Sequence, residues 1–169
     1  RNSGLPVPEY DKMGENRFGL DAKWDFTAGL WLEGSYSRKN RNTGLITNEL
    51  ALNAGIDYTI PAGNGLYLGF EQLLASFDEK PFAFSSRKNF SLVTANYPVG
   101  LSDKLSTFIY YDWGASEIYT FLNWQKQLER IMFHIMVYWN PETVLLPSQS
   151  GTENLFAGQG IQFMLVFNH

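Results

Sequence analysis

The chain of 169 residues has no cysteine, so a disulfide framework, thiol catalysis and a cysteine-based zinc site are all excluded. Charge is also scarce. Charged residues make up 18%, and the net charge of -4 offers no basic face of the kind that nucleic acid binding requires. No apolar run approaches the roughly 18 residues of a membrane helix. Aromatic residues, by contrast, reach 16% of the chain. The composition shows no break, which indicates one domain.

Nine segments alternate apolar and polar side chains with a period of two, the pattern of β-strands whose two faces meet different surroundings. They cover residues 17–26, 30–37, 49–60, 66–75, 90–99, 105–113, 117–125, 131–139 and 159–167. The segment 90–99 leaves its sidedness open, because Val93, Ala95 and Tyr97 compete with Phe90 and Leu92. No segment has the period of a helix, so an all-β fold is predicted.

The connections between these strands alternate in length. Residues 1–16 are rich in Pro, Gly, Asn and charge and predict a leader loop, whereas 17–169 hold all the strands and form the single domain. A medium polar loop is expected at 38–45 and long ones at 78–89 and 140–155, with short turns such as 61–65 between them. The very short break at 114–116 departs from this order. Short turns at one end and longer loops at the other predict the antiparallel up-and-down sheet of a transmembrane barrel.

The last strand carries a motif. Its Gly160 is followed by alternating apolar residues and by an aromatic residue near the chain end. These positions are Ile161, Phe163, Leu165 and Phe167. The ending resembles the C-terminal signature of Gram-negative outer-membrane β-barrels of the porin or exporter type, although Asn168 and His169 follow the aromatic residue. The resemblance implies a transmembrane antiparallel up-and-down β-barrel in the bacterial outer membrane. It also implies contact with membrane lipid and lipopolysaccharide, and with the barrel-assembly machinery through the last strand.

The strand count and the loop order disagree by one strand. In bacterial barrels the last strand ends in the periplasm, so counting back places residues 1–16 on the extracellular side as an extracellular leader. Such barrels have an even number of strands and normally keep both ends periplasmic. Together with a start at Arg1, this predicts a processed or truncated chain, the C-terminal section of a larger even-stranded barrel. An open edge in lipid would otherwise leave backbone groups unpaired.

Alternation alone does not say which face is outside, because a soluble lipocalin-like barrel turns its apolar face inward. Two further features favour the membrane barrel. Glycines recur on the polar face at Gly19, Gly55, Gly69 and Gly160, where they suit a curved wall or a large neighbour such as Tyr67. Aromatic residues of the apolar face cluster near strand ends, as an aromatic girdle requires. The girdle candidates are Trp24, Tyr58, Trp113, Trp124, Trp139 and Phe167.

The polar face is predicted to line the lumen. A register that sets Asp25 opposite Trp31 would place Lys23 opposite Glu33 as a cross-strand ion pair. The remaining acidic excess predicts a wall that favours cations. The same charges fit a second interpretation equally well, in which they form a network of side-chain contacts that keeps the barrel wall round. The lumen-facing candidates are Arg17, Asp21, Lys23, Asp25, Glu33, Glu49, Asp57, Glu71, Asp112, Glu117, Arg130 and His134.

A group of basic residues lies in a predicted outer loop and consists of Arg38, Lys39 and Arg41. Its side chains either contact lipopolysaccharide phosphates or are solvated.

His134 is the one candidate for chemistry on the polar face. It lies between Met132 and Met136, and a register that pairs Gln125 with Arg130 would put Phe121 opposite it. No serine or carboxylate adjoins it on its strand, so no Ser-His or Asp-His arrangement is predicted. With two histidines and no cysteine, no spacing recommends a metal site. We therefore expect neither an enzyme nor a cofactor.

Three functions remain open. The first is a pore for small hydrophilic solutes with a preference for cations. The second is a non-transporting outer-membrane barrel that acts as an anchor, an adhesin or a subunit of an envelope complex with other chains. The third is a soluble ligand-binding barrel. Barrel width separates the first two, because eight to ten strands are filled by side chains whereas roughly 14 or more leave a channel.

Overall fold

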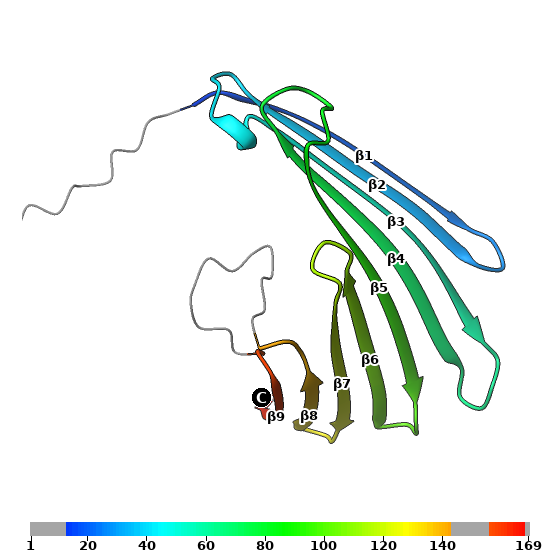
Figure 1. The fold of residues 1–169 in the computed structure, drawn as a ribbon. Coiled ribbons are helices and arrows are strands. Elements are labelled where there is room, and N and C mark those ends of the chain that lie inside the picture. The colour runs from blue at the N-terminus through cyan, green and yellow to red at the C-terminus, as the bar shows by residue number, and fades with distance from the viewer. Residues whose placement is uncertain (1–12, 143–155, 168–169) are drawn as a thin grey trace, which may run out of the picture.

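A computed structural model describes residues 13–142 and 156–167 of the chain. Within them lie nine strands and one short 3-10 turn, η1 (Gly44–Ile46) (Figure 1). The strands are β1 (Glu15–Asp25), β2 (Gly29–Lys39), β3 (Asn48–Ile60), β4 (Leu66–Asp78), β5 (Ser86–Pro98), β6 (Asp103–Asp112), β7 (Glu117–Gln127), β8 (Ile131–Trp139) and β9 (Gln159–Phe167). The described part of the chain holds no helix of the length and apolarity that crossing a membrane would take.

All nine strands form one antiparallel sheet in sequence order, from β1 at one edge to β9 at the other. The predicted all-β, up-and-down arrangement of nine strands is therefore confirmed. The sheet is open, since β1 and β9 each pair on one side only. Strand bounds differ from prediction mainly at the loops. β1 begins two residues inside the predicted leader, and β4 and β5 extend to leave only residues 79–85 between them. Residues 1–12 and 143–155, which include most of the leader and of the last long loop, lie outside the described residues, as do Asn168 and His169.

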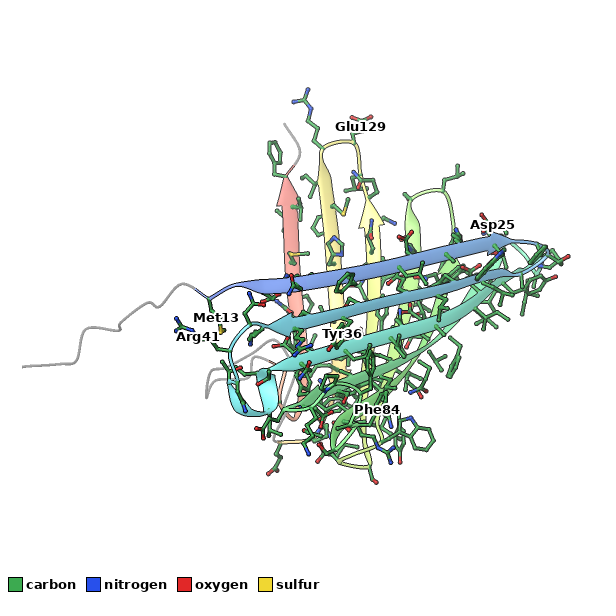
Figure 2. All side chains as sticks on the ribbon, turned by 90° about the horizontal axis from the view of Figure 1, so that it is seen from above. Met13, Asp25, Tyr36, Arg41, Phe84 and Glu129 are labelled. Carbon is green, nitrogen blue, oxygen red and sulfur yellow. The ribbon has the colours of Figure 1, made fainter. Side chains whose placement is uncertain are left out.

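The sheet is strongly coiled. Figure 1 shows β1 to β5 as a long slanted ribbon that turns into the shorter, steeper strands β6 to β9. Seen from above, β1 to β3 run across the direction of β7 to β9 (Figure 2). Because each strand is rotated relative to the last, coiling of this kind gives a sheet one concave and one convex face.

The register of the first hairpin differs by two residues from the predicted one, and its turn is shorter. Asp25 pairs with Gly29, so Asp21 lies opposite Glu33 and Lys23 lies opposite Trp31. The predicted Lys23–Glu33 pair is therefore wrong, and Lys23 instead contacts Asp25 on its own strand at 3.3 Å. Gly29 is the first residue of β2, where a Cβ would lie 2.8 Å from the Asp57 carboxylate, so a glycine fits this position better than a larger residue.

The hairpin of β7 and β8 is tighter as well. β7 continues to Gln127, so Gln125 lies opposite His134 and Phe121 lies opposite Tyr138. The predicted pairings of Gln125 with Arg130 and of Phe121 with His134 are wrong. The tight turn accounts for the shift, because Leu128 donates its amide to the Ile131 carbonyl at 2.7 Å.

The sidedness of β5 is resolved by its neighbours. Val93 lies opposite Phe70 on β4 and Ile109 on β6, so it belongs to the apolar face. Leu92 lies opposite Glu71 and thus on the other face. Two adjacent apolar residues therefore face opposite sides of the sheet, which is why alternation alone left the strand ambiguous.

The sheet has almost no apolar core of its own. Tyr119, 5% exposed, is the one apolar side chain that is buried within the described residues. Large side chains of the apolar face are exposed instead, with Phe163 73% and Leu20 69% exposed. A soluble domain of this length would be expected to pack its apolar residues tightly together. Residues 13–142 and 156–167 form this one sheet and supply no second layer over its apolar side.

The loop ends of β3 and β4 are held by a polar cluster. Asn48 donates to the Glu79 carbonyl at 2.8 Å and accepts from the Tyr36 hydroxyl at 2.7 Å. The Asp78 carboxylate accepts from Ser76 Oγ at 2.6 Å and from the Ser85 amide at 3.0 Å. These bonds fold the connection between β4 and β5 back onto the sheet.

Candidate functional site: an acidic concave face

The concave face consists of the odd-numbered positions of β1 to β4 and β7 and the even-numbered positions of β5, β6, β8 and β9, as the strand registers require. Side chains from β1 through β7 on this face line one hollow of about 610 Å³. Strands that lie six places apart can line one hollow only on the inside of a curve. The polar face is therefore the concave one.

Four polar side chains cross the middle of this face in order. Asp21 on β1 lies opposite Glu33 on β2, and Glu33 lies opposite Asn53 on β3. Asn53 donates from Nδ2 to the Glu71 carboxylate of β4 at 3.2 Å. We call Asp21, Glu33, Asn53 and Glu71 the acidic row. Like charges directly opposite each other are unfavourable, so the Asp21–Glu33 pair costs stability unless a cation or water screens it.

No cation lies within 4.0 Å of Asp21 or Glu33 among the residues that the structure describes. The basic residues of this face sit towards the strand ends instead. Lys39 contacts Glu49 at 3.1 Å near the loop end of β2, and Arg17 contacts Glu15 near the start of β1. Both Asp21 and Glu33 are exposed to the hollow. The middle of the concave face is thus a band of negative charge.

The far side of the hollow is apolar and aromatic. Leu73 lies opposite Asn53, and Phe90 of β5 lies opposite Leu73. Tyr110 and Tyr119 pair across β6 and β7 and line the same hollow. The concave face therefore combines carboxylates over β1 to β4 with rings over β5 to β7.

The structure puts nearly all predicted lumen candidates on this one face. Arg130 is the exception, because it lies in the turn before β8 and is exposed. On the concave face lie Arg17, Asp21, Lys23, Asp25, Glu33, Glu49, Asp57, Glu71, Asp112, Glu117 and His134. The acidic row brings together Asp21, Glu33 and Glu71, whereas Asp112 and Glu117 face each other at the hairpin of β6 and β7.

Sequence reasoning missed several residues of the same face. The bases Lys39, Lys88 and Lys104 share it, because β2 reaches Lys39 and the registers of β5 and β6 turn the other two inward. The predicted outer-loop cluster is thereby divided. Arg38 lies on the convex face, Lys39 on the concave face, and Arg41 in the following loop.

The predicted girdle residues lie at both ends of the convex face. Trp113 follows the last residue of β6, and its Nε1 donates to Ser91 Oγ at 2.9 Å. Trp139 lies at the same end, which is the end of the longer loops. The remaining four, Trp24, Tyr58, Trp124 and Phe167, lie towards the end of the short turns.

His134 lies in the middle of β8, on the concave face. It pairs with Gln125 on one side and with Met164 on the other. No group of three or more His, Cys, Asp or Glu side chains that could hold a metal ion occurs within residues 13–142 and 156–167.

Comparisons with known proteins add no further guide. Neither protein-family models, nor curated proteins, nor solved structures gave a match to this chain.

Proposed function

We propose that this chain forms part of the wall of a transmembrane β-barrel in a bacterial outer membrane. Its concave face would line a path for small hydrophilic solutes, with a preference for cations. The observation that carries the proposal is the polarity of the two faces. Within the described residues, the middle of the concave face holds carboxylates with no cation in contact with Asp21 or Glu33, and the convex face holds large exposed apolar side chains.

Lipid is the surrounding that fits the convex face. Burying apolar surface stabilises a protein by roughly 25 cal/mol per Å², so leaving this face in water would forgo most of the driving force for folding. A bilayer supplies the missing apolar contact. A lipocalin-like soluble barrel requires the opposite curvature, with the apolar side chains inside.

Closure of the wall requires further strands. The free edges of β1 and β9 would leave backbone N–H and C=O groups unpaired in lipid, at several kcal/mol each. Strands of the same polypeptide or of other chains in an envelope complex would pair with them. The exposed Arg38 on the convex face suits contact with lipopolysaccharide phosphate, and β9 suits contact with the barrel-assembly machinery.

The preference for cations rests on the acidic row. A cation about 4 Å from a carboxylate in water gains about 1 kcal/mol, which corresponds to roughly fivefold in partition. Asp21 and Glu33 lie opposite each other, and no basic side chain of the described strands and loops contacts them, so a passing cation would relieve their repulsion.

Planar-bilayer recording of the whole protein tests this function. In asymmetric KCl we expect conductance steps with a reversal potential on the cation-selective side. The Glu33→Gln substitution should lower the cation-to-anion permeability ratio by up to about fivefold. Glu49→Gln is the matched control and should change it less, because Lys39 already neutralises Glu49.

Two outcomes would decide against the pore. A folded protein that extracts into detergent, shifts on unboiled gels and gives no conductance steps is a non-transporting barrel, the anchor or complex subunit. A protein that stays in the aqueous phase without detergent is no membrane barrel at all.

A further inference from the structure

The concave face of β8 and β9 gathers soft sulfur and nitrogen donors. The chain has four methionines, and all except Met13 lie here around the one histidine that the structure describes. We call Met132, His134, Met136 and Met164 the thioether patch. It lies outside the acidic row and plays no part in the selectivity proposed above.

The register brings these donors within reach of one ion. His134 and Met164 are directly opposite each other, and such pairs have Cβ atoms about 4.5–5.5 Å apart. Met132 and Met136 flank His134 two residues away on the same face of β8. They are diagonal neighbours of Met164, at about 7–8 Å, a separation that long side chains can span. An ion above the sheet could therefore take the His134 imidazole, the Met164 sulfur and one or both flanking sulfurs.

The donor set selects the class of ion. Thioethers are soft ligands that favour Cu(I), whereas carboxylates and carbonyls suit Mg²⁺, Ca²⁺ and Mn²⁺. The positions opposite the patch on β7 are Gln125 and Gln127 for His134 and Met132, so no carboxylate is placed to compete. The patch is also open to solvent, with Met164 47% exposed.

A second observation points to the same place. Gln162 lies opposite Met136 and beside Met164, and its Oε1 is buried without a hydrogen-bond partner in the described part of the chain. A ligating histidine usually donates its other ring N–H to an acceptor nearby. Gln162 is a diagonal neighbour of His134, so its Oε1 is placed to accept that bond.

We propose that the thioether patch binds a soft monovalent metal ion of the Cu(I) class. The site is made by β8 and β9 alone and does not depend on the acidic row. An experiment can therefore support or refute this metal site independently of the proposed pore.

The first test uses the unaltered protein, folded in detergent, with ¹³C-labelled methionine methyl groups. Ag(I) serves as a redox-inert substitute for Cu(I). We expect Ag(I) to shift the signal of Met164 together with Met132, Met136 or both, and to leave Met13 unchanged. Zn²⁺ and Ca²⁺ should shift none of them. Equal shifts at Met13 would mean binding to any exposed thioether, and no shift at Met164 would mean no site; either result would overturn the proposal.

The second test measures Cu(I) affinity by competition with a coloured Cu(I) chelator under reducing conditions. Met164→Leu and His134→Phe should each weaken binding by more than the roughly 10–100-fold that outer-shell changes cost. Gln162→Leu should weaken it by about that range. Met13→Leu is the control and should bind as the unaltered protein does. Leu replaces Met at nearly constant volume, so folding should persist, and unboiled gel mobility checks it. Unchanged affinity in both Met164→Leu and His134→Phe would refute the site.

Discussion

At the residue scale, the concave face depends on glycines that lie beneath large aromatic side chains. A Cβ at Gly55 would collide with the Trp31 indole on the neighbouring strand, and one at Gly160 would collide with the Tyr138 ring. Gly69 lies beside Tyr67, as the sequence predicted. These rings therefore occupy space on the concave face that a Cβ at the glycine would need.

Replacing Gly55 with alanine should therefore destabilise the sheet. Because the Trp31 indole would have to move away from an added Cβ, we expect Gly55→Ala to lower the free energy of unfolding by about 1–3 kcal/mol. Gly19→Ala is a matched control on the same face, since its nearest atom would be the Gly34 carbonyl oxygen at 3.8 Å. Urea unfolding of the protein in lipid vesicles measures both. Equal losses for the two variants would contradict this role of Gly55.

Individual residues also show where sequence reasoning stops. Alternation placed Lys23 and Glu33 on one face correctly, because the side-chain period fixes the face. It could not fix which residues lie opposite each other, because hairpin register depends on the turn. A shift of two residues leaves every side chain on its face and yet replaces an expected ion pair with the Asp21–Glu33 pair. The three carboxylates of the acidic row were therefore predicted, but Asn53 and the geometry of the row were not.

At the scale of single elements, β5 is the strand that best distinguishes the two faces. Leu92 and Val93 are adjacent, similar in size, and at the middle of the strand. Val93 is 43% exposed on the convex face, and Leu92 lines the hollow of the concave face. The sequence could not assign them, because both faces of this strand are apolar. Only the pairing of Val93 with Phe70 and of Leu92 with Glu71 on β4 shows which face each residue belongs to.

An arginine at each position should have very different effects. A charge on the lipid side near the middle of a bilayer costs about 2–4 kcal/mol, so if the convex face meets lipid as proposed, Val93→Arg should reduce the stability of the protein folded in a bilayer by that amount. Leu92→Arg would place its charge beside Glu71 in the hollow, and we expect a smaller loss. Reversible unfolding from lipid vesicles measures both. A larger loss for Leu92→Arg would reverse the assignment of the faces.

At the scale of the whole molecule, the number and order of strands followed from the sequence, because period-two alternation and turn residues are local signals. A curved sheet with its polar face inside was predicted as well, but from the glycines, the aromatic residues and the resemblance to a membrane barrel, because curvature accumulates from twist between all nine strands and has no single residue behind it. Curvature is also what matters most for function, since it makes the polar face the inner one. The open edges at β1 and β9 belong to this scale as well, and in a membrane both need partners.

The most direct measurement of the central claim is spin labelling on adjacent residues of β3 and β5 in the protein folded in a bilayer. The chain has no cysteine of its own, so single cysteines at Leu52, Asn53, Leu92 and Val93 can each be labelled without background from it. If lipid covers the convex face and water fills the concave one, labels at Leu52 and Val93 will be more accessible to oxygen than labels at Asn53 and Leu92. Labels at Asn53 and Leu92 will be more accessible to a water-soluble nickel complex. The reverse pattern of accessibility, or equal access to the nickel complex at all four positions, would contradict a membrane barrel with an acidic inner wall.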